Sequence, residues 1–139
     1  MKHFDNFSNS LAVLLRAEKE KALSDAIYRM GVIGQFNLTF ELAWKALKEI
    51  LQLHGAGNFK TGSPRDVLKT AYQFNFLNDG EIWLDILKSR NSIVHIYNEN
   101  AAIELAEKIF DNYITAFVNL RELLAEKLSA VNDTFERKL

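Results

Sequence analysis

Apolar residues recur at every third or fourth position along much of the chain, which is the spacing of one buried face on an α-helix. The longest run predicts a helix that begins after Ser24 or Asp25, continues to about Leu53 and is ended by Gly55 and Gly57. Its expected buried face comprises Ile27, Met30, Ile33, Phe36, Phe40, Ala43, Leu47 and Ile50. No segment of useful length alternates with the two-residue period of a strand. The pattern therefore predicts an all-α protein.

A second long run of apolar spacing lies toward the C-terminus. It predicts a helix capped by Asn98 or Asn100, with a face close to a heptad seam. That face comprises Ile103, Ala106, Phe110, Tyr113, Phe117, Leu120 and Leu124. The polar stretch from Ser129 to Leu139 follows, and we expect it to be a frayed tail.

Capping residues and helix breakers predict three shorter helices. The first spans about residues 6–21, and its expected buried side comprises Leu11, Leu14, Leu15 and Ala22. Ser63-Pro64 predicts the start of another, because serine caps a helix and proline suits the first helical position. The turn Asn78-Asp79-Gly80 precedes the last of the three, over about residues 81–94. We therefore expect an antiparallel, up-and-down bundle of about five helices.

Composition limits the classes of protein and of site. The 139 residues are 48% hydrophobic and 25% charged, which suits one folded domain over residues 1–128 with a polar tail over 129–139. The absence of cysteine excludes disulfides and thiolate chemistry. A net charge of -1 means that any RNA-facing surface is a local patch. With no apolar run near the ~20 residues of a membrane span, no signal peptide and no metal-ligand spacing, we expect a cytoplasmic protein without metal or cofactor.

The densest candidate chemistry lies at the end of the helix predicted over residues 81–94. Arg90 shares a helix face with Trp83 and Leu87, where a guanidinium is costly to bury without a partner. Either this face opens onto a cleft, or it meets a partner that carries an anion. Alternatively, Arg90 pairs with a nearby carboxylate such as Glu81, Asp85 or Glu99, or reaches solvent. These interpretations stay open on the spacing alone.

His95 follows Arg90 by five residues, so on a regular helix the two side chains point roughly 140° apart. They converge only if the helix ends or distorts between them, or if they meet across a dimer axis. A phosphate can then lie between Arg90, His95 and the N-terminus of the next helix, with histidine as general base or acid. The alternative is a histidine that only caps or packs at a helix end.

A second candidate surface lies on the long helix that ends near Leu53. Trp44 and Lys45, with Glu41 and Lys48, can form a wall that stacks on a base and contacts phosphate. The same residues also fit a core tryptophan flanked by solvated ion pairs. Arg65 can bind phosphate from the first turn of its helix, or can simply be solvated.

The motif around Arg90 resembles the R-x4-H-x-Y signature of HEPN domains, the higher eukaryote and prokaryote nucleotide-binding class. Its matching residues are Arg90-Asn91-x-x-x-His95-x-Tyr97. Three further blocks are similar to the nucleotidyltransferase substrate-binding subfamily: Phe40-Glu41-Leu42-Ala43-Trp44-Lys45 with Lys48, Ser63-Pro64-Arg65-Asp66, and Gly80-Glu81-x-Trp83-Leu84-Asp85. The four blocks fall in order over about residues 25–120, and together they are specific where any one is not.

The resemblance implies a dimeric helical bundle encoded beside a minimal nucleotidyltransferase. In related HEPN toxins, the arginine and histidine of two protomers line a cleft and cleave RNA without metal. Carried over, Arg90 stabilises the phosphate, His95 assists proton transfer, and Asn91 orients the phosphate or the imidazole. Tyr97 is then the residue to which the partner adds adenylyl groups, whose phosphates repel RNA.

Two other functions stay open from the sequence. The chain can be a non-catalytic module that binds a nucleotide or substrate for the transferase, using Arg90 and the Trp44–Lys45 wall. It can also be a purely structural dimerisation bundle, which the near-neutral charge and the heptad-like seam favour. The presence of a tyrosine two residues beyond His95 favours the toxin.

Overall fold

The computed structural model describes residues 1–56 and 62–138, with side chains described as far as residue 131. Its α-helices are α1 (Lys2–Leu15), α2 (Lys19–Ser24), α3 (Ala26–Leu53), α4 (Pro64–Gln73), α5 (Gly80–Ser92), α6 (Glu99–Lys108) and α7 (Ile114–Lys138). A 3₁₀ turn, Ile93–His95, follows α5, and a π-helical turn, Ile109–Tyr113, joins α6 to α7. No strand occurs in the described ranges. The prediction of an all-α protein is confirmed.

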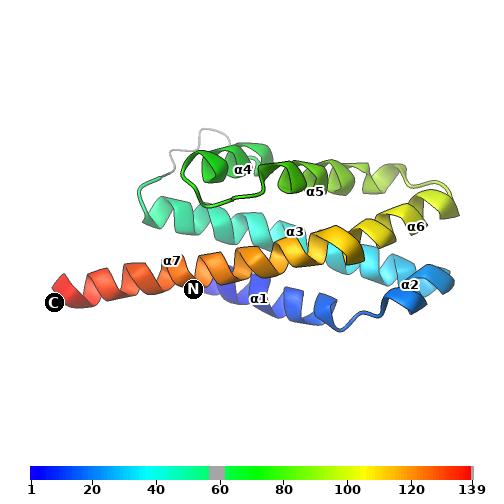
Figure 1. Ribbon diagram of the computed structural model, residues 1–139, viewed down its shortest axis with the longest axis horizontal. Coiled ribbons are helices and arrows are strands. Elements are labelled where there is room, and N and C mark those ends of the chain that lie inside the picture. Colours follow the sequence, from blue (N-terminus) through cyan, green and yellow to red (C-terminus); the bar gives the residue numbers. More distant parts are fainter. Residues whose placement is uncertain (57–61, 139) are drawn as a thin grey trace.

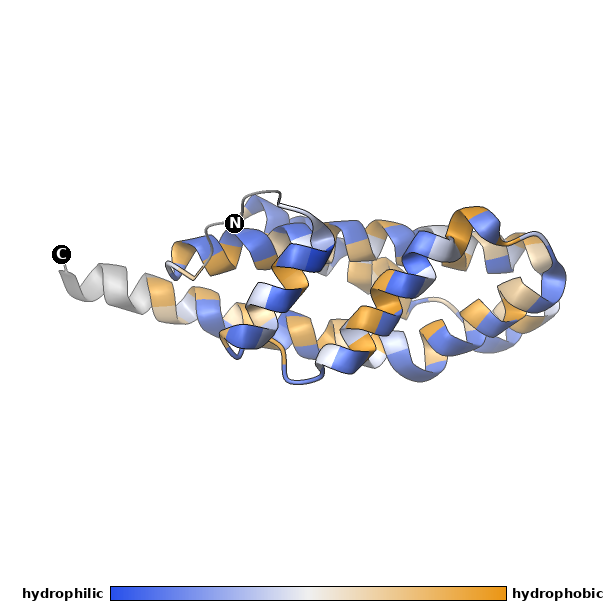
Figure 2. Cartoon of the chain, turned by 90° about the horizontal axis from the view of Figure 1, so that it is seen from above, coloured by the Kyte–Doolittle hydropathy of each residue, from blue (hydrophilic) through white to orange (hydrophobic). Residues whose placement is uncertain are grey.

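The helices lie side by side, and successive rods along the chain run in alternate directions: α1 and α5 point one way, α3 and the α6–α7 rod the other (Figure 1). Apolar and polar residues alternate along each of these helices (Figure 2), and the buried residues of the described chain are almost all apolar. The expected antiparallel bundle is therefore confirmed. No helix in the described part of the chain is both long enough and apolar enough to cross a membrane.

α3 is the central rod of the bundle, at about 40 Å in length. It begins where the sequence predicts, because the Asp25 carboxylate accepts the Tyr28 backbone N–H at 3.0 Å. It ends before Gly55, whose φ of +69° suits a residue without a side chain. Gly57, the other predicted terminator, lies outside the described residues.

The predicted buried face of α3 is wrong over its first turns. Ile27 and Met30 are 86% and 51% exposed, and Arg29 takes an inward position instead. Arg29 is only 2% exposed, and its guanidinium donates to the Ala22 and Leu23 carbonyls. It also pairs with Glu99 at 3.6 Å. A charged residue here satisfies the last carbonyls of α2, which an apolar pattern cannot reveal. From Ile33 onward the predicted face is buried.

The predicted first helix is divided into α1 and α2. Residues 16–18 interrupt it, and the Glu18 backbone N–H donates to the Tyr28 hydroxyl at 2.9 Å where α2 begins. The break turns Leu15 outward, to 43% exposed, while Leu11, Leu14 and Ala22 remain buried. The prediction was therefore correct for three buried residues and wrong for Leu15.

α6, the π-helical turn and α7 form one continuous rod that packs against both α1 and α3 (Figure 1). Asn98 caps it by accepting the Ala101 N–H at 2.8 Å, so of the two predicted caps it is Asn98 that acts. The predicted face is buried at Ala106, Tyr113, Phe117, Leu120 and Leu124, and half-buried at Ile103 and Phe110. The backbone of α7 continues as helix through residues 129–138, where we expected a frayed tail.

Aromatic side chains from four helices form the centre of the core. Phe36 stacks on Tyr113 with ring centroids 5.5 Å apart, and Trp83 meets Phe117 edge to face, also at 5.5 Å. Phe7 of α1 contacts Phe117 at 6.3 Å. Trp83 also lies beside Phe40, with ring centroids 6.4 Å apart, so these contacts fix α5, which carries the candidate site, against α3 and α7.

Candidate functional site at the end of α5

α5 stops between the two residues of the motif. Arg90 and Asn91 lie in its last turn, whereas His95 closes the 3₁₀ turn that follows. The Ser92 hydroxyl donates to the Lys88 carbonyl at 2.9 Å, a local bond that competes with the regular helix. Ile96 then leaves the turn in an extended conformation, with φ -83° and ψ 96°. The helix thus ends between Arg90 and His95, which is one of the conditions under which the sequence allows them to converge.

Arg90 is held by α3, across the bundle from its own helix. Its guanidinium lies over the ring of Phe40, 5.7 Å from the ring centroid, and forms an ion pair with Glu41. Its Nη1 also donates to the Asn91 Oδ1 at 3.0 Å. The Arg90 and Glu41 side chains are 28% and 26% exposed, so water and a ligand can reach the pair.

Arg90 does not pair with Glu81, Asp85 or Glu99, the carboxylates that the sequence suggested. Asp85 accepts the Tyr113 hydroxyl at 2.5 Å, and Glu99 pairs with Arg29. The true partner, Glu41, is distant in sequence and was predicted only as part of the α3 wall. Only tertiary contact between α3 and α5 reveals this role.

Glu41 also connects the α3 wall to Arg90. The Trp44 indole N–H donates to the Glu41 Oε2 at 3.1 Å, while the Oε1 faces Arg90. The Lys45 ammonium lies 5.9 Å from the centroid of the Trp44 ring. Because Glu41 bonds to both residues, the orientations of the Trp44 indole and the Arg90 guanidinium depend on one carboxylate.

A hollow of about 670 Å³ lies beside Arg90, between the start of α4 and the outer face of α5; we name it the Arg90 hollow. Its lining residues are Ser63, Pro64, Arg65, Glu81, Leu84, Asp85, Leu87, Lys88, Arg90, Asn91 and Ser92. Two predicted phosphate-binding residues, Arg65 and Arg90, therefore share one hollow with Asn91. Ser63 caps α4 by accepting the Asp66 N–H at 3.2 Å, which fixes the turn that carries Arg65.

The other predicted wall residues do not line this hollow. Trp44 and Lys45 lie behind Arg90, on the α3 side of Glu41. The Lys48 ammonium lies against Gly62, just before α4. The sequence grouped Trp44, Lys45, Lys48 and Arg65 as one binding set, and the structure places only Arg65 with Arg90.

His95 opens onto a different hollow, of about 250 Å³, between α5 and α6; we name it the His95 hollow. Its lining includes Ser89, Ser92, Glu104 and Lys108. Asp85, Lys88 and Ser92 line both hollows, so these side chains form the ridge between them. Among the described residues, no hydrogen bond joins Arg90 to His95.

Tyr97 lies beside His95 and is open to solvent. Its hydroxyl is 3.4 Å from the His95 Nδ1, the ring centroids are 6.3 Å apart, and its side chain is 83% exposed. A weak, solvent-exposed contact of this length leaves both groups able to engage another molecule. Val94, at 75% exposed, adds an apolar surface next to them.

Tyr113 secures the helix that carries the motif. Its buried hydroxyl donates to the Asp85 carboxylate at 2.5 Å, so the Ser89 hydroxyl, at 2.7 Å, is the donor to Tyr113. Burial, followed by the bond to Asp85, raises the pKa of Tyr113 well above its ordinary value, and the phenol stays protonated. From the sequence we recognised Tyr113 only as a core residue.

Comparison with known proteins agrees with the four sequence blocks. Residues 2–126 match the family described as nucleotidyltransferase substrate binding protein like. A relative, the probable ribonuclease HepT of Haemophilus influenzae, is 27% identical over 95 residues. That match covers 67% of this chain and 65% of the relative, which is less than two thirds of its length. The chain therefore belongs to the nucleotidyltransferase substrate-binding family of the HEPN superfamily.

Proposed function

We propose that the chain is a HEPN-type toxin, a cytoplasmic, homodimeric endoribonuclease that needs no metal and uses Arg90 and His95. The observation that carries the proposal is the position of Arg90 at the end of α5. There it shares a hollow with Arg65 and Asn91, just ahead of an exposed His95–Tyr97 pair. The name of the Haemophilus relative, a probable ribonuclease, supports the same activity.

The proposed reaction is transfer of an RNA phosphate to the neighbouring 2′-hydroxyl. The 2′-oxygen attacks phosphorus, the bond from phosphorus to the 5′-oxygen breaks, and a cyclic phosphate and a 5′-hydroxyl end result. His95 accepts the 2′-proton or donates a proton to the leaving 5′-oxygen. Arg90 stabilises the added charge on the phosphate, and Asn91 orients the phosphate or the imidazole. Arg65 binds a neighbouring phosphate of the same strand.

A homodimer is proposed because one chain does not bring the catalytic pair into one hollow. Arg90 and His95 open on opposite sides of the ridge formed by Asp85, Lys88 and Ser92. A second copy that packs against the exposed turn at Val94 can bring its own motif beside the first. A composite cleft between two copies then contains two arginines and two histidines.

Regulation by a minimal nucleotidyltransferase is proposed to occur at Tyr97. The exposed phenol attacks the α-phosphorus of ATP, pyrophosphate leaves, and the phenol proton passes to solvent or to a base of the partner. The 3.4 Å separation of this hydroxyl from His95 supports the choice of residue. A phosphodiester at this place adds negative charge beside the cleft and repels RNA.

A second candidate function is a non-catalytic nucleotide-binding or substrate-binding subunit of a two-component nucleotidyltransferase. The Arg90–Glu41 ion pair favours it, because an arginine already neutralised by a carboxylate is less available to a scissile phosphate. The Trp44 and Lys45 side chains can contribute a stacking surface and a cation in this function.

The deciding experiment is cleavage of a mixed tRNA and mRNA pool in EDTA by the purified chain, with Arg90→Ala and His95→Ala variants. Arg16→Ala and His3→Ala provide matched controls, since Arg16 is exposed between α1 and α2 and His3 pairs with Glu49 of α3. We expect cleavage by wild type and both controls, and loss in both motif variants. Absence of cleavage by unmodified, dimeric wild type contradicts the ribonuclease and favours the binding subunit.

A further inference from the structure

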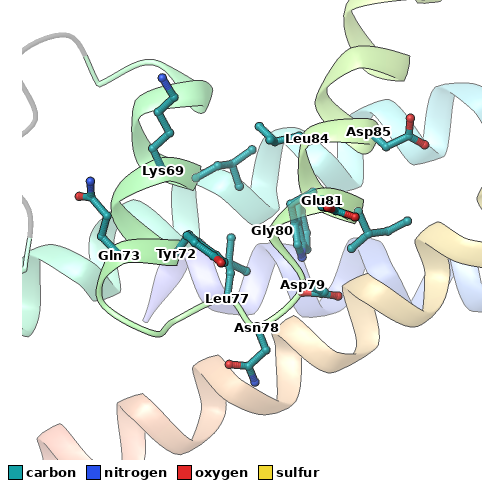
Figure 3. A pocket seen from close by; sticks show the side chains of 13 residues that line it. Lys69, Tyr72, Gln73, Leu77, Asn78, Asp79, Gly80, Glu81, Leu84 and Asp85 are labelled. Atoms are coloured by element: carbon teal, nitrogen blue, oxygen red, sulfur yellow. The ribbon is translucent and has the colours of Figure 1, made fainter.

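A larger hollow, of about 850 Å³, lies between α4 and the first turns of α5; we name it the Tyr72 hollow. Its apolar lining comprises Leu68, Tyr72, Leu77, Ile82, Trp83 and Leu84. Figure 3 shows Tyr72 projecting from α4 toward the start of α5, with Leu77 in the connecting loop close by. The volume is within the usual range of about 300–1,000 Å³ for ligand sites, and the proposed catalytic residues do not line it.

The Tyr72 ring is held in place yet remains accessible. A side chain at Gly80 would place its first carbon 2.9 Å from the ring, so the ring packs directly on the Gly80 backbone. Tyr72 is nevertheless 59% exposed, and Leu84 on the opposite wall is 45% exposed. Two large apolar side chains thus remain in contact with water on either side of a formed hollow, as in protein recognition sites.

Trp83 lines the hollow and carries an indole N–H for which no hydrogen bond is found among the described residues. Its side chain is 1% exposed. In the proposal below, this N–H bonds to an acceptor that enters the hollow beside the Trp83 ring.

The charged side chains around the hollow are mainly acidic. Of the described residues, Asp79, Glu81 and Asp85 line it together with one cation, Lys69. Asp85 is already bonded to Tyr113, whereas neither Asp79 nor Glu81 forms an ion pair within the described ranges. Asp79 occupies the N-cap position of α5 and yet makes no capping bond with its side chain. This charge disfavours phosphates and favours a positively charged occupant.

We propose that the Tyr72 hollow is a docking site for a basic segment of a partner protein. The segment inserts an apolar side chain between Tyr72 and Leu84 and offers a backbone carbonyl to the Trp83 N–H. Its lysine or arginine pairs with Asp79 or Glu81. A peptide satisfies all three features together, because it combines apolar side chains, backbone acceptors and basic groups. The proposal is independent of whether the chain cleaves RNA.

The test is NMR titration of the isotope-labelled, full-length chain with a capped peptide of lysine and leucine. A peptide of the same length with glutamate for lysine is the charge control, and AMP is the nucleotide control. The readout is the indole N–H resonance of Trp83, assigned by its survival in Trp44→Phe. We expect the lysine peptide to shift this resonance together with amides of residues 68–85, and the other two ligands to leave it unchanged.

Matched variants test the contacts. Glu81→Gln is expected to weaken the lysine peptide about fivefold, the upper range for an exposed ion pair, and Leu84→Asp to weaken it further. Glu126→Gln, an exposed substitution on α7, should leave its affinity unchanged. The proposal is overturned if the Trp83 resonance does not move, if the glutamate peptide or AMP moves it equally, or if Glu126→Gln weakens binding as much as Glu81→Gln.

Discussion

Arg90 and Glu41 form an ion pair between α5 and α3, and the same carboxylate accepts the indole N–H of Trp44. The pair is about a quarter exposed, so its Coulomb energy is reduced by solvent but not abolished. A phosphate that approaches Arg90 must compete with Glu41 for the guanidinium. Glu41 therefore both orients Arg90 and limits its affinity for an anion.

Replacing Glu41 with glutamine is expected to strengthen RNA binding. The amide oxygen can still accept the Trp44 N–H, while the competing charge at Arg90 is removed. Because the pair is partly exposed, we expect the Kd for single-stranded RNA to fall by up to about fivefold. Fluorescence anisotropy in a His95→Ala background measures binding without cleavage. Glu122→Gln, an exposed substitution on α7, is the control and should leave RNA binding unchanged. Unchanged or weaker RNA binding by Glu41→Gln would show that Glu41 does not compete with the phosphate for Arg90.

Local signals in the sequence were enough to predict several structural details. Asp25, Ser63 and Asn98 cap their helices as predicted, because a cap is a bond between residues three apart. The Arg90–Glu41 pair could not be predicted, since it depends on how α5 lies against α3. The sequence could offer only neighbouring carboxylates.

The inward position of Arg29 shows the same limit in the core. Apolar spacing assigned Ile27 and Met30 to the buried face, but the carbonyls at the end of α2 required a donor there. Such a requirement arises only after the chain has broken between α1 and α2. The candidate site is similar: the sequence predicts Arg90 and His95 as site residues, whereas the separate hollows in which they lie depend on the packing of α4 and α6 against α5.

Arg29→Ala is expected to destabilise the protein by about 3 kcal/mol. The substitution leaves the Ala22 and Leu23 carbonyls without their donor and opens a space in a buried position. Urea unfolding followed by circular dichroism measures the free energy of unfolding. Arg16→Ala, at an exposed position, should change it by less than about 0.5 kcal/mol. A similar loss in both variants would show that Arg29 does not secure α2.

Stability should fall in alkaline solution, and Tyr113 should account for part of the fall. Its pKa in the folded protein is raised above the ordinary value of 10.0, first by burial and then by the bond to Asp85. Folding therefore favours the protonated phenol. The contribution is fully present below pH 10.0 and is lost as pH rises through the folded pKa, since the unfolded chain ionises first.

Tyr113→Phe isolates this contribution. We expect the variant to be about 1–2 kcal/mol less stable than wild type at pH 7, because the Asp85 and Ser89 bonds are lost. The difference should shrink above pH 10. The Lys19 pKa is raised by its bond to Asp111, and the Lys21 pKa by its bond to Glu18, so both lysines also titrate in this range. Both lysines are present in wild type and in the variant, so their contributions cancel in the difference between the two free energies of unfolding. A difference that is constant between pH 8 and pH 11 contradicts the role of the phenol.

Tyr97→Phe should separate modification from folding. The residue is 83% exposed and its hydroxyl makes a weak contact with His95, so the free energy of unfolding should change by less than about 0.5 kcal/mol. Incubation with a minimal nucleotidyltransferase and ATP should add adenylyl groups to wild type, visible by intact-protein mass spectrometry, and none to the variant. Tyr28→Phe provides the control, since Tyr28 is a tyrosine of α3 that lies outside the motif and does not line the Tyr72 hollow. Adenylylation of Tyr97→Phe to the wild-type level would place the modification on another residue. Undiminished RNA binding by the modified wild type would show that the added phosphate does not block the cleft.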